Sequence, residues 1–224
     1  MRSHTSSQPH RHAALRLHEL LRDREAICII SGGSALDVFA ELPEDDLVRT
    51  IFMLGDERWS RAPGSNNYVQ YAARFTDHPL LPQLVDTSVA PDESHRAYAE
   101  RLARTFKQLQ HERPHALIIA LLGIGSDGHT AGIFPMNEQS FIETYEADVP
   151  YVPINVEGLS EPFRASLTPS EIERSAAIVA YATGSEKHDV LTELHVTKRS
   201  LHEQPAQLIA RHANADLFTD QSFS

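Results

Sequence analysis

The sequence predicts a single α/β domain built on a mostly parallel, doubly wound, Rossmann-like sheet with helices on both faces. Short, unbroken apolar runs alternate along the chain with amphipathic helical patterns, which is typical of buried parallel strands joined by crossover helices. Several of these runs end in polar segments that contain glycine. In such sheets ligands bind beyond the carboxyl ends of the strands, so these segments are the candidate site.

The first half of the chain begins with a polar segment, residues 1–12, which we expect to be a flexible tail before a domain spanning 13–224. Leucines at helical spacing among charges then predict an amphipathic helix, and short apolar runs predict strands. The predicted elements are a helix over 13–24, a strand over 26–30, a helix over 35–42, a strand over 50–54, and helices near 68–75 and over 93–110.

The second half contains the most apolar run, ALIIALL at 116–122, which predicts a fully buried strand. Further strands are predicted over 151–155 and 176–182, and a helix over 185–196 that is entered through the Thr183-Gly184 turn. Between them, Arg164 is expected in a loop ahead of a helix whose start is marked by Thr168 and Pro169.

Composition excludes several classes of protein. With 31 acidic against 20 basic residues and a formal net charge of -11, the surface repels nucleic acid. The single cysteine, Cys28, can form neither an internal disulfide nor a cysteine cluster for zinc, and its apolar strand indicates core packing. Without a secretory signal or a run long enough to cross a bilayer, we expect a cytoplasmic protein with no membrane partner, as a monomer or weak homo-oligomer.

The SGGS segment, Ser31 to Ser34, follows a predicted buried strand and precedes a helix. The two glycines, Gly32 and Gly33, let the backbone curl so that N–H groups point at one spot, and Ser34 is a good N-cap. Such a turn binds a phosphate, although by itself the pattern is also that of a simple turn.

The second polar segment is GDERW, Gly55 to Trp59, at the end of the next strand. Arg58 is suited to orient a carbonyl or phosphate oxygen, with Asp56 or Glu57 holding the substrate or a water. The alternative is a salt-bridged turn, and the sequence does not say which carboxylate faces the pocket.

The third segment, GIGSDGHTAGIFP, follows the most buried strand and carries Asp127 and His129. Because the two residues are two apart in a glycine-rich turn, the carboxylate can fix the imidazole tautomer and raise its basicity. His129 is therefore the leading general base. The alternatives are a structural histidine, one among the 13 of this chain, or a metal ligand whose partners the sequence does not reveal.

Two cationic residues complete the candidate set. Lys187 lies in the first turn of a predicted helix, where a cation faces the wrong end of the helix dipole, so a nearby anion would explain it. Arg164 also follows a turn segment. The alternative for each of the two residues is an ordinary surface charge in contact with solvent.

Together these segments resemble the glucosamine-6-phosphate isomerase/6-phosphogluconolactonase family. The matching motifs, in family order, are SGGS, DERW followed by SNNY, LLGIGSDGHTAGIFP, FRASLT and GSEKHDVL. The form DGHTAGIFP is similar to the lactonase branch, because the deaminases have DGHIAFNEP there. Departures are Ala35-Leu36 where the family has Thr-Pro, Met136 where glycine is usual, and a loose match around Arg164.

The resemblance implies hydrolysis of 6-phospho-D-glucono-1,5-lactone, a sugar-phosphate lactone, in the oxidative pentose phosphate pathway, with no metal and no organic cofactor. It implies that His129 is the general base toward water, that Asp127 orients it, and that Arg58 polarises the lactone carbonyl. The residues that would contact the substrate are Ser31, Gly32, Gly33, Ser34, Arg164 and Lys187 at the 6-phosphate, together with Asp56 and Asn66.

Two alternatives from other classes remain open at this stage. A sugar-phosphate isomerase or deaminase would use a carboxylate, with Asp56 the candidate, to move a proton beside the carbonyl while His129 assists ring opening. A sugar-phosphate sensor on the same fold would bind 6-phosphogluconate without turnover, because a fold does not guarantee an activity.

Overall fold

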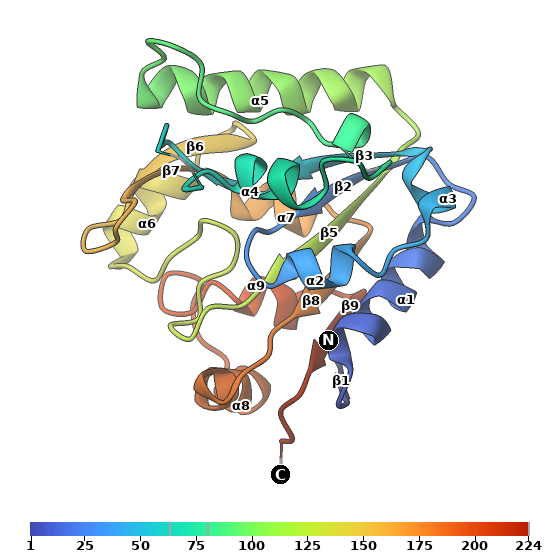
Figure 1. Cartoon of the computed structure of the whole chain (residues 1–224). Coiled ribbons are helices and arrows are strands. Elements are labelled where there is room, and N and C mark those ends of the chain that lie inside the picture. The colour runs from blue at the N-terminus through green and yellow to red at the C-terminus, as the bar shows by residue number, and fades with distance from the viewer. Residues whose placement is uncertain (63, 80, 224) are drawn as a thin grey trace.

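The computed structural model describes residues 1–62, 64–79 and 81–223, which form two sheets surrounded by helices (Figure 1). Within these residues the larger sheet is entirely parallel, in the order β1-β9-β8-β5-β2-β3. Its strands are β1 (Arg2–Thr5), β2 (Ala26–Ile30), β3 (Thr50–Leu54), β5 (Leu117–Gly123), β8 (Ala177–Tyr181) and β9 (Ala215–Thr219). A small antiparallel sheet has the order β4-β7-β6. Its strands are β4 (Asp56–Arg58), β6 (Tyr151–Asn155) and β7 (Phe163–Leu167).

Helices connect most of the strands. They are α1 (Pro9–Leu21), α2 (Ala35–Phe39), α3 (Glu44–Leu47), α4 (Asn67–Arg74), α5 (His95–Glu112), α6 (Glu138–Tyr145), α7 (Pro169–Glu173), α8 (His188–Val196) and α9 (Gln207–Arg211), with short 3₁₀ turns η1 (Leu81–Gln83) and η2 (Ser185–Lys187). Side-chain caps begin three of the longer ones: Asn66 for α4, Ser94 for α5 and Asn137 for α6 each accept a backbone N–H.

The side chains of β2 point alternately to the two faces of the large sheet, and both faces are covered by helices. Ile27 and Ile29 pack into one hydrophobic core with residues of α5, α8 and α9. Ala26, Cys28 and Ile30 pack into a second core with residues of α1, α2 and α4. Because both faces of the strand are buried, its sequence is a continuous apolar run. The predicted doubly wound α/β fold is confirmed.

The strand register brings the candidate segments to one edge of the sheet. Ile30 at the end of β2 pairs with Leu54 at the end of β3 and with Leu121 near the end of β5. Leu122 of β5 in turn pairs with Ala180 of β8. The turns that follow these strands therefore start side by side, as expected for a parallel sheet.

The expected tail over residues 1–12 is wrong, because this segment forms β1 and the start of α1. β1 pairs with β9 at the sheet edge, and both termini lie in the lower half of Figure 1. The buried Asp216 holds the segment by accepting from Arg2 at 2.7 Å and Arg16 at 2.9 Å, and His4 lies 2.9 Å from its other oxygen. The side chains of β1 are all exposed, so the strand has no apolar signal in the sequence.

Two further expectations are corrected by the small sheet. The strand at 151–155 is not part of the parallel sheet but an edge strand of the antiparallel one, where Pro153 is tolerated. Arg164 lies in β7, not in a loop. The strands β4, β7 and β9 are not among the predicted elements, since each is short and mixes polar with apolar residues.

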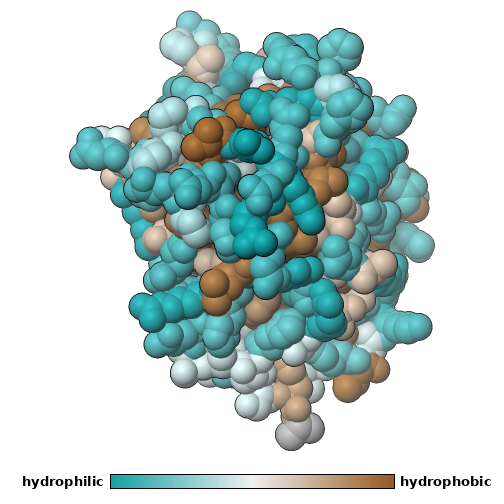
Figure 2. All heavy atoms as spheres, turned by 90° about the vertical axis from the view of Figure 1, so that its right-hand side faces the viewer, coloured by the Kyte–Doolittle hydropathy of each residue, from teal (hydrophilic) through white to brown (hydrophobic). Residues whose placement is uncertain are grey.

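The face that carries α1 and α3, on the right of Figure 1, is mainly hydrophilic, and its hydrophobic side chains lie in small separate patches (Figure 2). Leu15 of α1 and Val48 after α3 are exposed, and scattered residues of this kind are ordinary on a protein surface. No helix in the described part of the chain is both long and apolar enough to cross a membrane.

Candidate active site

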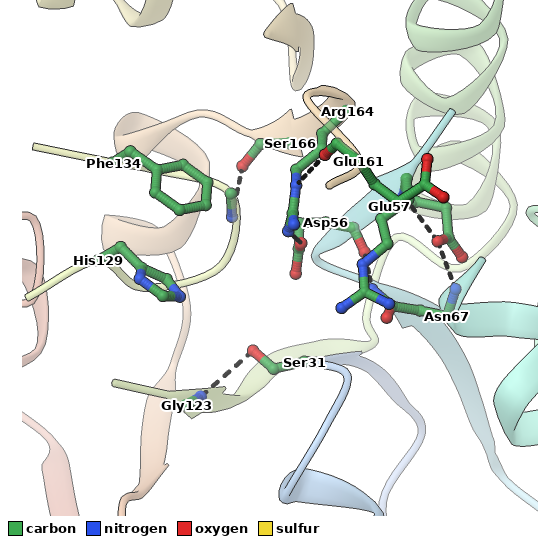
Figure 3. A network of polar contacts seen from close by, with 12 residues as sticks. Ser31, Asp56, Glu57, Asn67, Gly123, His129, Phe134, Glu161, Arg164 and Ser166 are labelled. Carbon is green, nitrogen blue, oxygen red and sulfur yellow. Dashed lines mark hydrogen bonds and ion pairs between the residues drawn. The ribbon is translucent and has the colours of Figure 1, made fainter. Parts of the chain in front are cut away.

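A cavity of about 210 Å³ opens at the edge where the parallel strands end. The predicted site residues that line it are Ser31, Gly32, Gly33, Ser34, Asp56, Arg58, His129, Arg164 and Lys187. In Figure 3, His129 and Phe134 lie on one side, Asp56, Arg164 and Asn67 on the other, and Ser31 with Gly123 below. The predicted phosphate turn and the predicted base therefore share one cavity.

The Ser31–Ser34 turn is fixed at its first residue by two neighbouring elements. The Ser31 carbonyl accepts from the Tyr71 hydroxyl at 2.8 Å, and the Ser31 hydroxyl accepts from the Gly123 N–H at 3.3 Å. Gly33 has φ +65°, a conformation that glycine adopts without strain. The turn is thus locked against β5 and α4 before any ligand binds.

His129 and Asp127 form a hydrogen-bonded pair. His129 Nδ1 lies 2.5 Å from Asp127 Oδ1, which also accepts from the His129 N–H at 3.1 Å. Burial acts to raise the pKa of Asp127, but the hydrogen bonds and charge of His129 outweigh it, so that pKa lies below its ordinary value. Among the described residues His129 Nε2 has no hydrogen-bond partner, so it is available as a base.

The ring of His129 needs its glycine-rich surroundings. A Cβ on Gly125 would lie 2.0 Å from His129 Nδ1, so only glycine fits there. The Gly125 N–H donates to the His129 carbonyl at 2.8 Å, and Gly128 has φ +84°. The imidazole also stacks on Phe134, with ring centroids 4.6 Å apart. The imidazole is therefore packed against both the Gly125 backbone and the Phe134 ring.

The loop after His129 joins the two sheets. The Thr130 hydroxyl donates to the Gly123 carbonyl at 2.8 Å, which ties the loop to β5. The Gly132 N–H donates to the Ser166 hydroxyl of β7 at 3.1 Å, and the Tyr145 hydroxyl donates to the Gly132 carbonyl at 2.8 Å. These bonds set the distance between the imidazole and the small sheet.

The small sheet contributes a buried ion pair, Asp56 of β4 and Arg164 of β7, with Asp56 Oδ2 3.6 Å from Arg164 Nη1. Burial raises the pKa of Asp56 and lowers that of Arg164, and the charge of each partner opposes the shift of the other. The Arg164 guanidinium also lies over the Phe134 ring, 5.5 Å from its centroid. Through Arg164 the pair is thus linked to the aromatic ring on which His129 stacks.

Glu57 faces away from the cavity and supports α4. Its carboxylate accepts from the N–H groups of Arg58, Asn67 and Tyr68 and from the Thr87 hydroxyl. Burial raises the pKa of Glu57 to about 8, although the three N–H donors favour the charged carboxylate and act to lower that pKa. Of the two adjacent carboxylates in GDERW, Asp56 lines the cavity.

The cations Arg58 and Lys187 both line the cavity. Arg58 Nη1 donates to the Ser65 carbonyl at 2.9 Å, while its buried Nε has no partner among the described residues. Lys187 follows the Gly184 turn, whose φ is +102° and whose N–H donates to the Asp220 carboxylate at 3.1 Å. These two side chains and the Ser31–Ser34 turn give the cavity a surplus of hydrogen-bond donors.

Comparison with known proteins decides the family. The model of the family described as glucosamine-6-phosphate isomerases/6-phosphogluconolactonase matches residues 3–218. The chain belongs to this family.

Its relatives include 6-phosphogluconolactonases from several organisms. The Homo sapiens protein is 26% identical over 224 aligned residues, covering 88% of this chain and 82% of that one. The Borreliella burgdorferi protein is 30% identical over 104 residues, but the match covers only 45% of this chain and 41% of that one.

Solved structures of 6-phosphogluconolactonases share the fold. The Shewanella baltica enzyme has a TM-score of 0.79 at 20% identity and covers 97% of this chain and 95% of that one. The Thermotoga maritima enzyme has a TM-score of 0.76 at 20% identity, with 97% and 98% covered.

One polar side chain of this family member's cavity, that of Asn67, is absent from the sequence-based predictions. Asn66, one of the predicted substrate contacts, is instead buried outside the cavity lining, where it caps α4 and donates to the Arg58 carbonyl. Its neighbour Asn67 lines the cavity instead. Only the point at which α4 begins distinguishes the two asparagines, and neighbouring identical residues give no such signal in the sequence.

A metal site was among the alternatives for His129. In the described part of the chain no three His, Cys, Asp or Glu side chains gather where they could hold a metal ion. The cavity instead combines one carboxylate, one imidazole and three cations.

Proposed function

We propose that this family member hydrolyses 6-phospho-D-glucono-1,5-lactone to 6-phospho-D-gluconate in the oxidative branch of the pentose phosphate pathway. The observation that carries the proposal is the cavity, which is lined both by His129, whose Nε2 has no hydrogen-bond partner among the described residues, and by a donor-rich, cationic wall. Relatives named 6-phosphogluconolactonase support the choice of reaction within the family.

The wall formed by the Ser31–Ser34 turn, Lys187 and Arg164 would hold the 6-phosphate. Backbone N–H groups and a lysine ammonium suit the oxygens of a phosphate, and a rigid turn loses little freedom on binding. Arg164 adds a further positive charge, part of which is balanced by Asp56 at 3.6 Å. Anchoring the phosphate fixes the rest of the sugar, so that the reactive carbon meets the base.

The chemical step begins when His129 Nε2 takes a proton from a water whose oxygen attacks C1 of the lactone. Asp127 keeps the other ring nitrogen, Nδ1, as the donor and stabilises the imidazolium that forms. Arg58 stabilises the negative oxygen of the tetrahedral intermediate. The bond between C1 and the ring oxygen then breaks, and the proton on His129 passes to that oxygen, leaving an open-chain acid.

The test is hydrolysis of the purified lactone by purified protein, with and without a metal chelator, after subtracting the rate without enzyme. We expect rapid acid release that is unchanged by the chelator. Loss of activity in chelator would contradict the metal-free mechanism, and an absence of activity above the spontaneous rate would contradict the proposed reaction.

One observation favours a second candidate, an isomerase or deaminase of the same family. The carboxylate of Asp56 lines the cavity, and burial raises its pKa. Such a carboxylate is suited to moving a proton beside a carbonyl. Release of ammonia from glucosamine 6-phosphate, in place of acid from the lactone, would establish this reaction. Tight binding of 6-phosphogluconate without either turnover would indicate a sensor.

A further inference from the structure

Asn67 is the first residue of α4 and one of the most buried polar side chains of the cavity wall, with 3% of its surface exposed. It plays no part in the reaction steps described above. It lies on the side of the site opposite His129 (Figure 3).

The orientation of the Asn67 amide is set by its neighbours. Nδ2 donates to the Asp56 backbone carbonyl at 3.0 Å, and a flipped amide would place two oxygens against each other. Oδ1 is therefore the atom left over, and among the described residues it is buried without a hydrogen-bond partner. A buried acceptor without a donor is costly, which points to a donor supplied by a ligand.

The Oδ1 atom lies against the predicted phosphate turn. A Cβ on Gly32 would be 2.4 Å from Asn67 Oδ1, so glycine at this position makes room for the amide. The acceptor and the phosphate turn are thus neighbours in the cavity wall.

The chemistry of the acceptor limits what it binds. A phosphate at neutral pH and a lactone carbonyl offer oxygens that accept hydrogen bonds, and Asn67 Oδ1 has no proton to give them. A sugar hydroxyl does have one. The rest of the polar wall is rich in donors, so Asn67 Oδ1, a neutral acceptor without a partner among the described residues, is suited to a hydroxyl.

We propose that Asn67 Oδ1 accepts a hydrogen bond from the C4 hydroxyl of the substrate and is a specificity-determining residue. The inference rests on the proposed function, in which the adjacent Ser31–Ser34 turn holds the 6-phosphate. In the δ-lactone the C5 oxygen belongs to the ring ester, so the C4 hydroxyl is the hydroxyl closest along the carbon chain to the phosphate-bearing C6. With the phosphate held in the turn, the C4 hydroxyl is therefore the hydroxyl expected nearest to an acceptor beside that turn.

The experiment is a cycle of two enzymes and two substrates. Wild type and Asn67→Leu are each assayed on the gluco lactone and on its 4-deoxy analogue, both made from the corresponding sugar 6-phosphate. Loss of the hydroxyl should lower kcat/KM of the wild type about 10-fold, and Asn67→Leu should lower it similarly on the gluco substrate. In Asn67→Leu the two substrates should differ by less than about 2-fold, because the partner of the hydroxyl is gone.

Two controls separate recognition from structure. Asn137→Leu makes the same chemical change at the N-cap of α6, outside the cavity lining, and should leave the ratio between the two substrates as in the wild type. Asn67→Asp keeps an acceptor at this position; its second oxygen faces the Asp56 carbonyl and should lower kcat/KM on both lactones, but the preference for the gluco substrate should remain. Should Asn67→Leu fail to fold, Asn67→Ala makes the same comparison with a smaller side chain.

The outcomes distinguish the inference from the proposed function. If the wild type hydrolyses both lactones equally well, the function stands and the role of Asn67 is wrong. If the wild-type preference persists in Asn67→Leu, Asn67 has a purely structural role and the inference is overturned. Should the wild type hydrolyse neither lactone, the proposed function fails, whatever Asn67 binds.

Discussion

The two halves of the site differ in how their charged residues are exposed and paired; Asp127 belongs to the site through its hydrogen bond to His129 and does not itself line the cavity. On the side of the parallel sheet, the His129 and Asp127 side chains are 34% and 54% exposed and lie 2.5 Å apart. On the side of the antiparallel sheet, the Arg164 and Asp56 side chains are 13% and 8% exposed and lie 3.6 Å apart. The pKa of Asp127 is lowered, whereas burial raises that of Asp56.

The difference separates a reactive pair from a supporting one. A base that exchanges protons with water benefits from a partly solvated position and a close partner that fixes its tautomer. A buried ion pair has lost its hydration, so each charge depends on the other and on the shape of the site. We therefore expect substitutions in the first half to change the reaction, and those in the second half to change stability as well.

The largest expected effect is on the reactive pair. His129→Ala should lower kcat for lactone hydrolysis by roughly 100-fold or more, the scale of a lost general base, while 6-phosphogluconate still binds. Steady-state kinetics and titration calorimetry measure the two quantities. Unchanged turnover would show that His129 has no part in the mechanism. Because the His129 side chain is partly exposed, we expect almost no change in the unfolding midpoint of this variant.

The supporting pair should respond in stability. Arg164→Leu leaves the buried carboxylate of Asp56 without its partner and should lower the free energy of unfolding by roughly 2–3 kcal/mol. Lys187→Leu removes a cation from the other wall of the same cavity. This change should alter the free energy of unfolding by less than about 0.5 kcal/mol. Denaturant unfolding of the two variants makes the comparison, and equal losses would erase the distinction between the halves.

A smaller effect is expected where the phosphate is held. Lys187→Ala should raise KM about 10-fold, as for a lost hydrogen bond to a charged group, and change kcat little, because the phosphate is remote from the bond that breaks. Inorganic phosphate as a competitive inhibitor should weaken in parallel. A fall in kcat with KM unmoved would place Lys187 at the reacting carbon instead.

The smallest effect is the opposite pH dependence of the two aspartates. The pKa of Asp127 is lowered on folding, so its contribution to stability is present above the unfolded pKa and is lost as pH falls through the folded value. The pKa of Asp56 is raised, so its contribution is present below the unfolded pKa and is lost as pH rises through the folded value.

Substitution of each aspartate by asparagine shows the direction in which that residue makes stability depend on pH. Relative to wild type, Asp127→Asn should lose stability as pH rises from about 3 to 6, by only a few tenths of a kcal/mol because the pair is exposed. Asp56→Asn should gain stability relative to wild type over its own titration. Unfolding free energies measured across this range give both slopes, and slopes of the same sign would contradict the assignment of the shifts.

The sequence by itself determined the fold class and the parallel-sheet half of the site. The strands at 26–30 and 50–54 begin and end where the apolar runs do, because burial on both faces leaves a continuous pattern. The Ser31–Ser34 turn and the loop around His129 were recognisable since glycine is required there by backbone conformation or close contact.

Only the tertiary structure decided the other half. β4 has three residues and β7 mixes polar with apolar ones, so neither has a pattern of its own, and their pairing is what brings Asp56 near Arg164. The edge strand β1 is specified by contacts with Asp216, more than two hundred residues away in the chain. The choice of Asn67 over Asn66 depends on where α4 starts, and therefore on the carboxylate of Glu57 that binds its first N–H groups. Local periodicity reports burial, whereas partnerships between distant polar groups exist only once the chain has folded.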